Sequence, residues 1–459
     1  MKPSTQGHAL ILAAGMGTRM KSALSKVLHP LVGRTMVGHV VESAKAAGLQ
    51  PVVVVHHQED AVRTALSDTG ALFARQEHTR GTGDAVSSAL SILPETGTVV
   101  VMAGDAPLLR SETIERLLQA HGDAAVTVLT VCLDDGAHYG RLERDSNGSA
   151  IRIVEAREAS SEQLNITEIN TGLYCFDIEW LRRALPELQP HAHKDEIYLT
   201  DTIELAATQG RVRVVIHDDF SEVQGVNDRW ELSGARQVLQ ARIIEEHAQE
   251  GVDFIAPHTN VVGVNVVLGR DVSIGLGVVL EGNTTIGAGV SVGPHCHLVN
   301  TTVGTCVTVH SHSVCEDAKI EDGATVGPFA RLRPLAHVGA GAKVGNFVEM
   351  KKATLGPGAK INHLSYVGDA VIGESANIGA GTITCNYDGF AKHKTTIGAG
   401  AFIGSNTALV APVNVGQGAI VGAGSVITKD VPEDAVSVAR GKQVDRPDAA
   451  SRFRSRKKS

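Results

Sequence analysis

The sequence VGVNVVLGRDVSIGLGVVLEGNTTIGAGVSVGPHCHL, which runs from Val262 to Leu298, repeats every six residues. An aliphatic residue, usually followed by glycine, opens each repeat, and the pattern resumes after slips in its frame until Ile427. The repeated positions are Val262, Leu268, Ile274, Leu280, Ile286, Val292 and Leu298, then Ile320, Val326, Leu332, Val338, Val344 and Met350, and finally Ile397, Ile403, Leu409, Val415, Val421 and Ile427. Such periodicity predicts a left-handed parallel β-helix, in which three six-residue sides form a coil and the aliphatic side chains stack inside it.

The N-terminal half alternates strand-like and helix-like segments, which predicts an α/β domain with a mainly parallel sheet. The expected strands cover residues 9–12, 51–55, 99–102, 125–131 and 212–216. The expected helices cover residues 36–47, 82–92 and 111–120. Ligands of such sheets bind beyond the carboxyl ends of the strands.

An amphipathic helix is expected between the two halves, because Asp228 can cap its start and Gly251 can end it. We therefore expect an N-terminal domain over residues 1–229, a helical linker over residues 230–250 and a β-helix domain over residues 251–459. The chain ends in the basic tail Arg452, Arg454, Arg456, Lys457 and Lys458. This tail is either a solvated end or a contact for an anionic ligand.

Composition narrows the class of protein. The formal net charge of −8 gives no sign of a nucleic-acid binder. No stretch approaches the roughly 20 apolar residues of a membrane span, so no membrane insertion is expected. The polar N-terminus does not resemble a signal peptide, and the six cysteines are scattered without CxxC pairing. These features predict a cytoplasmic protein with reduced thiols.

One group of histidines and cysteines falls within two predicted coils: His295, Cys296, His297, His310, His312 and Cys315. His297 and Cys315 are 18 residues apart, so they are expected to stack. Zinc needs several such groups that converge tetrahedrally, whereas side chains on a regular β-helix mostly diverge. No metal is therefore expected there.

The first expected strand runs into the glycine-rich turn LAAGMGTRM, Leu12 to Met20, and Lys26 follows shortly after. Backbone N–H groups of such a turn can approach phosphate oxygens, which Arg19 and Lys26 would neutralise. Two common phosphate motifs do not fit, because Met20 replaces the third glycine of the dinucleotide fingerprint and there is no GxxxxGK(S/T). Asp105, at the end of another strand, is a hard oxygen ligand suited to Mg²⁺.

Further motifs follow in order: Gln76 with Gly81-Thr82-Gly83, Gly104-Asp105, Tyr139-Gly140-Arg141, Val154-Glu155, Asn170-Thr171-Gly172 and Gly225-Val226-Asn227. With the turn and the repeats, this order resembles the bifunctional bacterial N-acetylglucosamine-1-phosphate uridyltransferase/glucosamine-1-phosphate acetyltransferase family over nearly the whole chain. The resemblance implies a Rossmann-like sugar-nucleotide pyrophosphorylase domain before the β-helix.

The resemblance also implies roles for single residues. Those expected around UTP and the sugar are Leu12, Ala13, Ala14, Gly15, Lys26, Gln76, Gly81, Thr82, Gly140, Glu155, Asn170, Thr200 and Asn227. Asp105 and Asn227 would hold Mg²⁺, and Arg19 and Lys26 would face the triphosphate. Three positions depart from the family: Ser25 replaces a usual Pro, Ala103 a common Tyr and Asp84 a common His.

A second site is expected where the repeat is interrupted. Arg333 and Lys351 are 18 residues apart, so one coil stacks two cations that an anion between them would stabilise. His363 is a candidate general base for acyl transfer, and a carboxylate such as Glu349 could orient it. An insertion from Cys385 to Lys394 follows, and loops that leave a rigid scaffold concentrate binding residues.

By the resemblance, His363 is the general base of an acetyltransferase. The acetyl-acceptor site would include Arg333, Glu349, Lys351, Tyr366 and Asn377. Acetyl-CoA would be bound by Ala380, Asn386, Tyr387, Ser405, Ala423 and Arg440. In the family, this site lies between the subunits of a homotrimer.

The sequence thus predicts an enzyme that acetylates glucosamine 1-phosphate and then transfers UMP from UTP to the product. The resulting sugar nucleotide is a donor for cell-wall and outer-envelope synthesis. Two alternatives stay open. One is a hexose-1-phosphate adenylyl- or thymidylyltransferase with a regulatory β-helix, and the other is a β-helix that serves only as an oligomerisation scaffold.

Overall fold

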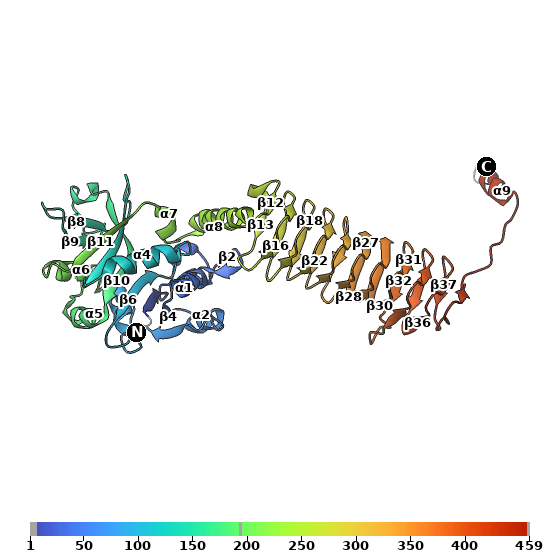
Figure 1. Ribbon diagram of the computed structural model, residues 1–459, viewed down its shortest axis with the longest axis horizontal. Helices are drawn as coiled ribbons and strands as arrows, with labels where there is room; N and C mark the ends of the chain where they lie inside the picture. Colours follow the sequence, from blue (N-terminus) through green and yellow to red (C-terminus); the bar gives the residue numbers. More distant parts are fainter. Residues whose placement is uncertain (1–6, 192–194, 457–459) are drawn as a thin grey trace. The chain divides into compact units, whose positions relative to one another are not determined.

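The computed structural model describes residues 7–191 and 195–456. The chain divides into two compact units, Met1–Leu239 and Gln240–Ser459 (Figure 1). No helix among the described residues combines the length and the apolar composition that crossing a bilayer requires. Arg452, Arg454 and Arg456 are exposed on the last helix, α9 (Ala449–Arg456), whereas Lys457 and Lys458 lie outside the described residues.

A mixed sheet forms the centre of the first unit, with the strand order β11-β7-β10-β6-β1-β4-β5. Its strands are β1 (His8–Leu12), β4 (Gln50–Val55), β5 (Leu72–Arg75), β6 (Thr98–Ala103), β7 (Val126–Cys132), β10 (Glu168–Asp177) and β11 (Val212–His217). Strand β10 is antiparallel to β6 and β7, and the hairpin β8 (Arg141–Arg144) and β9 (Ala150–Val154) extends from it. The five predicted strands are confirmed, while β5, β8, β9 and β10 were not predicted.

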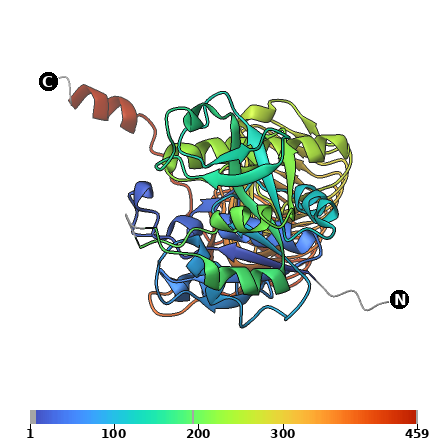
Figure 2. The same cartoon turned by 90° about the vertical axis from the view of Figure 1, so that its left-hand side faces the viewer.

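Helices cover both faces of this sheet (Figure 2). Leu10 of β1 belongs to a buried cluster with residues of α3 (Thr82–Ser88), α5 (Ile178–Ala184) and α6 (Asp201–Ala207). Its neighbour Ile11 points to the opposite face, towards α1 (Met36–Ala46), α2 (Glu59–Ala65) and α4 (Ser111–His121). Because β1 pairs in parallel with β4 and β6, the turns after these three strands meet at one edge.

One predicted helix is shorter in the structure, and the predicted joining helix is present. The helix expected over residues 82–92 ends at Ser88, where the hydroxyls of Ser87 and Ser88 donate to carbonyls of the preceding turn. The joining helix is α8 (Arg229–Gln249), and the Asp228 carboxylate caps it by accepting from the backbone N–H groups of Trp230 (2.8 Å) and Glu231 (2.9 Å). The division between the two compact units falls inside this helix.

The second unit is the predicted β-helix, whose successive coils of short strands are visible in Figure 1. Each strand pairs in parallel with the strand one coil later; Leu332, for example, is aligned with Cys315 before it and Met350 after it. Every aliphatic position predicted from the repeat is buried, with at most 7% of its surface exposed. The predicted fold class is therefore confirmed.

The six-residue repeat loses its frame where one side of a coil has five residues instead of six. Val303, Val309 and Cys315 continue the buried stack after Leu298, and the step from Leu298 to Val303 spans five residues. Leu298 is consequently aligned with Cys315, and His297 with Val314. The expected stacking of His297 on Cys315 is wrong for this reason.

The histidine and cysteine group divides between the inside and the outside of the β-helix. Cys296 and Cys315 are fully buried, and burial raises the pKa of Cys315 to about 12. His295 and His312 lie at one corner, where their rings stack with centroids 5.1 Å apart, and the stack continues through Phe329 and Phe347. We call His295, His312, Phe329 and Phe347 the corner ladder. It is a packing feature of the surface.

Removal of a stacked aliphatic side chain tests the assignment of the core. Leu332→Ala should lower the free energy of unfolding by about 2–5 kcal/mol, because the neighbouring coils cannot close the cavity. Urea unfolding of the full chain, followed by circular dichroism, measures this change. The matched control Val267→Ala truncates a side chain that is 57% exposed and should cost less than about 0.5 kcal/mol. Equal losses for the two variants would contradict the assignment.

Candidate active sites

The turn after β1 lies at the carboxyl edge of the sheet, as predicted. The backbone N–H of Ala13 donates to the carbonyl of Val54 (3.0 Å), and that of Gly104 donates to the carbonyl of Leu12 (2.9 Å). These bonds tie the turns after β1, β4 and β6 together. Ala14 and Gly15 continue the turn, and Gly15 has open space where a Cβ would be.

Gly17 allows the turn to approach Lys26. Its φ of 63° favours glycine, and a Cβ there would collide with the Lys26 side chain. Lys26 begins a short 3-10 helix (Lys26–Leu28) that is held against the glycine-rich turn. The turn therefore places a cation where the strands end.

Four predicted residues meet at this point. The Lys26 ammonium forms an ion pair with Asp105 and donates to Asn227 Oδ1 (3.1 Å). Arg19 donates to the same Asn227 oxygen (2.8 Å). Asp105 and Asn227 are also joined through the backbone, because the N–H of Val226 donates to the carbonyl of Asp105 (2.8 Å). The structure thus brings together the two cations and the two oxygen ligands for a metal that were expected from the sequence.

The chemistry of these donors fits Mg²⁺. One ammonium nitrogen contacts both the Asp105 carboxylate and the Asn227 amide oxygen, so the two oxygens converge on one point. Mg²⁺ prefers oxygen ligands, and it is commonly bound through one or two protein groups together with substrate phosphates. No group of three or more His, Cys, Asp or Glu side chains that could hold a metal occurs in the described parts of the chain.

Gln76, Gly81 and Thr82 lie together at the carboxyl edge of the sheet, just after β5. Gln76 follows β5, is only 3% exposed, and donates through Nε2 to the Asp84 carboxylate (2.9 Å). Gly81 has a φ of 96°, and a Cβ there would lie 2.5 Å from the carbonyl oxygen of Ile197. The Thr82 hydroxyl accepts from the backbone N–H of Leu199 (3.0 Å). Gly81 and Thr82 thereby pack against the segment that leads to Thr200.

The four residues expected around the sugar form one connected group. Thr200 donates to Glu155 (3.1 Å), and burial is the main cause that raises the Glu155 pKa. The backbone N–H of Asn170 donates to the carbonyl of Gly140 (2.9 Å), and its side chain donates to Tyr174 Oη (2.7 Å). Burial, followed by the charge of Glu155, raises the Tyr174 pKa, so Tyr174 connects the two pairs.

The structure shows the environment of two residues that depart from the family pattern, Ser25 and Ala103. Ser25 is fully buried, and its backbone N–H, which a proline would lack, donates to Gln58 Oε1 (2.8 Å). Its hydroxyl finds no hydrogen-bond partner among the residues that the structure describes. Ala103 ends β6, one residue before Gly104, and its small side chain is half-buried.

In the β-helix, Arg333 and Lys351 lie side by side as predicted. The alignment of Leu332 with Met350 places the residues that follow them next to each other. The positive charge of Arg333 is the main cause that lowers the Lys351 pKa, as expected for two neighbouring cations. A carboxylate partly compensates this repulsion, because Arg333 donates to Glu349 (2.7 Å), which raises the Arg333 pKa.

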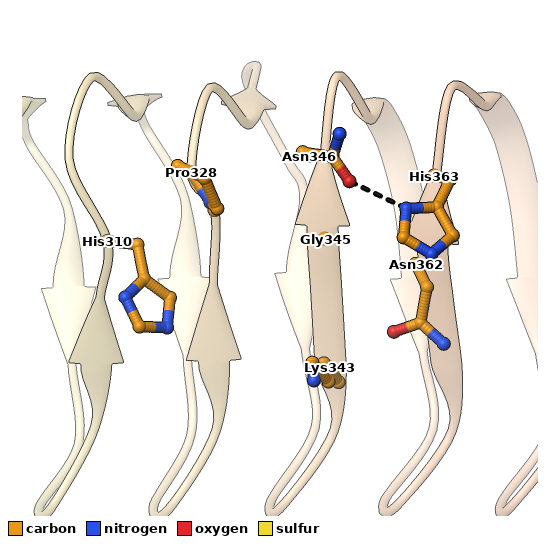
Figure 3. Close-up of a pocket in the computed structure, with 8 residues that line it drawn as sticks. His310, Pro328, Lys343, Gly345, Asn346, Asn362 and His363 are labelled. Carbon is orange, nitrogen blue, oxygen red and sulfur yellow. Dashed lines mark hydrogen bonds between the residues drawn. The ribbon is translucent and has the colours of Figure 1, made fainter.

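His363 ends β29 (Lys360–His363), directly beside Asn346 at the end of β27 (Lys343–Asn346). Its Nδ1 is 2.6 Å from Asn346 Oδ1, and this is the hydrogen bond drawn in Figure 3. The prediction that Glu349 orients His363 is therefore wrong. Glu349 binds Arg333 instead, and Asn346, one 17-residue coil before His363, is the orienting group.

A cavity of about 410 Å³ opens beside His363 (Figure 3). It is lined by His310, Gly327, Pro328, Lys343, Gly345, Asn346, Asn362 and His363. The side-chain oxygen of Asn362 is buried there, and no residue in the described part of the chain forms a hydrogen bond with it. The imidazole thus borders a polar space.

Tyr366 and Asn386 meet above Gly368. A Cβ on Gly368 would lie 2.5 Å from Tyr366 Oη and 2.8 Å from Asn386 Nδ2, so only glycine leaves room for both. Asn386 also donates to Asp369 (2.6 Å), a residue that sequence reasoning missed. Tyr387, within the insertion, is 61% exposed. Asn377 lies on β31 (Asn377–Ile378), paired with the strand of His363.

The remaining predicted residues follow one corner of the β-helix over successive coils. The carbonyl of Ala380 accepts from the backbone N–H of Asn406 (2.7 Å), next to Ser405. The carbonyl of Ser405 accepts from the N–H of Gly424 (2.8 Å), next to Ala423. Arg440 then donates to the carbonyl of Ala423 (2.6 Å). These four residues form a continuous strip along the corner.

Comparison with known proteins covers both units. A family model described as a MobA-like NTP transferase domain matches residues 9–161, and one described as a hexapeptide repeat of succinyl-transferase matches residues 394–429. The chain is 46% identical over 452 residues to "Bifunctional protein GlmU" of Brevibacillus brevis, which covers 97% of each chain. It is 43% identical over 439 residues to the protein of the same name from Marinobacter nauticus, covering 95% of this chain and 96% of the relative.

A third relative, from Exiguobacterium sibiricum, has the same name and is 46% identical over 445 residues, which are 96% of this chain and 99% of the relative. Identity at this level spans the glycine-rich turn, the sheet and the β-helix in one alignment. The order of the two units is therefore shared as well as their folds. The chain belongs to the family of the bifunctional protein GlmU.

Proposed function

We propose that the chain catalyses two reactions of UDP-N-acetylglucosamine synthesis. The β-helix acetylates glucosamine 1-phosphate with acetyl-CoA, and the N-terminal unit transfers UMP from UTP to the resulting N-acetylglucosamine 1-phosphate. The meeting of Arg19, Lys26, Asp105 and Asn227 at the sheet edge of the N-terminal unit supports the uridylyl assignment. The paired Arg333 and Lys351, together with His363 and its partner Asn346, support the acetyltransferase assignment.

In the uridylyl reaction, an oxygen of the sugar phosphate attacks the α-phosphorus of UTP, and the bond to pyrophosphate breaks. Both reactants are anions, so positioning and charge neutralisation supply most of the catalysis. Arg19 and Lys26 would hold the triphosphate against the turn after β1. Mg²⁺ held by Asp105 and Asn227 would neutralise further phosphate charge. Glu155, Asn170, Thr200 and Gly140 would line the sugar.

In the acetyl reaction, the amine of glucosamine 1-phosphate attacks the thioester carbon. The C–N bond forms, the C–S bond breaks, and CoA leaves as a thiolate that takes up a proton. His363 would accept the amine proton at Nε2, because Asn346 Oδ1 accepts a hydrogen bond from Nδ1 and so favours the tautomer with a free Nε2. Arg333 and Lys351 would bind the sugar phosphate.

The acetyl-CoA strip would consist of Ala380, Ser405, Ala423 and Arg440, with Asn386 and Tyr387 nearby. We propose that a homotrimer completes this site. Large aromatic side chains that another subunit could cover support this proposal. They are Tyr387 (61% exposed) and Phe390 (97%) in the insertion, and Phe329 (47%) and Phe347 (55%) in the corner ladder. The proposed domains are residues 1–229 and 251–459, joined by residues 230–250, in a cytoplasmic enzyme.

Two assays of the purified full chain test the proposal. The first measures CoA release from acetyl-CoA with glucosamine 1-phosphate. The second measures pyrophosphate release from UTP with N-acetylglucosamine 1-phosphate, and sedimentation gives the oligomeric state. Pyrophosphate release from ATP or dTTP with a hexose 1-phosphate, without any acetyl transfer, would favour a nucleotidyltransferase with a regulatory β-helix. The absence of both activities would favour a scaffold.

Loss of the Asp105 carboxylate should abolish the uridylyl reaction. Asp105→Ala leaves Asn227 as the single oxygen donor at the point where the two converge, so Mg²⁺ and the phosphates are no longer held. Pyrophosphate release at varied Mg²⁺ concentration measures this effect. Acetyl transfer by the same preparation serves as the folding control and should be unchanged. A parallel loss of both activities in a folded protein would contradict separate sites.

His363→Ala should slow acetyl transfer by about 10²–10⁴-fold, the usual contribution of a general base. Uridylyl transfer should stay normal, because His363 is exposed and the core is built from the stacked aliphatic positions. The measurement is acetyl transfer across pH, with sedimentation as a check on assembly. Turnover near that of the unchanged chain, with the same pH profile, would exclude His363 as the base.

Asn346 and Glu349 should affect acetyl transfer differently. Asn346→Ala removes the partner of His363 and should lower kcat by roughly threefold to tenfold, the effect of one hydrogen bond. Glu349→Ala frees the Arg333 guanidinium and should act mainly on KM for glucosamine 1-phosphate. Steady-state kinetics of both variants at saturating acetyl-CoA separates the two. If Glu349→Ala lowered kcat and Asn346→Ala did not, the assignment of the orienting group would be reversed.

A further inference from the structure

Gln76 is held in place along its backbone. Its N–H donates to the carbonyl of Val55 (2.9 Å), and its own carbonyl is 2.8 Å from Nδ1 of His56. The side chain is almost completely buried at the edge where the glycine-rich turn lies. Only the amide group therefore has freedom to turn, and its orientation decides whether a donor or an acceptor is presented.

The surroundings of the amide fix this orientation. Nε2 donates to the Asp84 carboxylate (2.9 Å) and, more weakly, to the carbonyl of Gly81 (3.4 Å). Both partners can only accept hydrogen bonds, so the nitrogen and not the oxygen must face them. Both amide hydrogens are thereby used. Oε1 accepts no hydrogen bond from any residue within 7–191 or 195–456, and it is the polar atom left for a ligand.

Asp84 is itself held by an ion pair. Arg80, one helical turn earlier, donates to its other carboxylate oxygen (3.0 Å), and only 14% of the Asp84 side chain is exposed. An ionised carboxylate has no hydrogen to donate, whereas an asparagine in the same place could present either a donor or an acceptor. Asp84 therefore enforces one orientation of Gln76, and Arg80 keeps Asp84 in place.

We propose that Asp84, clamped by Arg80, is a positioning residue that makes the nucleotide site selective for uracil. The inference rests on the proposed uridylyl function and takes Gln76, one of the residues expected around UTP, as the residue that faces the base. Gln76 Oε1 is an acceptor, so it pairs with the imide N–H of uracil. The corresponding ring nitrogen of cytosine is an acceptor, and two facing acceptors are both left without a partner. Such a mismatch in a buried site lowers kcat/KM by roughly tenfold to hundredfold.

The test compares UTP and CTP as substrates of the full chain. Pyrophosphate release is measured with UTP and with CTP at fixed N-acetylglucosamine 1-phosphate and Mg²⁺. Asp84→Asn should lower the UTP/CTP ratio of kcat/KM by roughly tenfold, because the Asn amide lets Gln76 turn its nitrogen towards the base. Arg80→Ala, which removes only an exposed clamp, should lower the same ratio by a smaller factor. Asp60→Asn, the same substitution at an exposed position of α2, is the matched control and should leave the ratio unchanged.

Urea unfolding of each variant, followed by circular dichroism, reports whether the N-terminal unit is folded. A folded Asp84→Asn with an unchanged ratio would overturn the inference, and so would equal losses with UTP and CTP. If Asp84→Asn does not fold, an unchanged ratio in Arg80→Ala overturns it instead. A parent chain that does not release pyrophosphate from UTP would overturn the proposed function itself, which is a separate outcome.

Discussion

Parallel pairing between successive coils is the constraint on which the β-helix depends. Each strand repeats the alignment of the strand one coil earlier, so like positions form rows along the axis. Inward rows are mainly aliphatic, with a few buried Thr and Ser side chains such as Thr384, and outward rows carry the chemistry. The rows bring Arg333 beside Lys351 and Asn346 beside His363. Side chains in one row point in the same direction, so they cannot surround a ligand. A ligand must therefore also contact neighbouring rows, the corners of the coils or the insertion.

The repeat made the fold of this half predictable and its details only partly so. A six-residue period places Leu332 and Met350 in one row, and the 18-residue spacing of Arg333 and Lys351 follows from it. The pairing of Asn346 with His363 spans 17 residues, because one side of that coil is shorter. Sequence periodicity alone does not show which side is shortened. Glu349 was suggested only as a nearby carboxylate that could orient His363, and the structure places it against Arg333 instead.

In the first unit, the sequence predicted which strand ends carry chemistry but not how distant segments meet. The glycine-rich turn and Asp105 could be placed at one edge from the α/β pattern. Asn227 lies 201 residues after Lys26, and only the resemblance to a family connected them before the structure did. The antiparallel β10, which carries Asn170, was missed because the turn-like run Asn170-Thr171-Gly172 interrupts it, where its register with β7 shifts. The Asp84 clamp depends on side-chain geometry that no spacing reveals.

The six cysteines differ in burial, so they should differ in their reactivity towards thiol-modifying reagents. Cys175, Cys296 and Cys315 are buried with raised pKa values, so at neutral pH they remain protonated and unreactive towards electrophiles. Cys132 and Cys306 are exposed, one in each unit. Maleimide fluorophores would therefore attach first at these two positions. Energy transfer between them would report the separation of the two units in solution without any engineered cysteine.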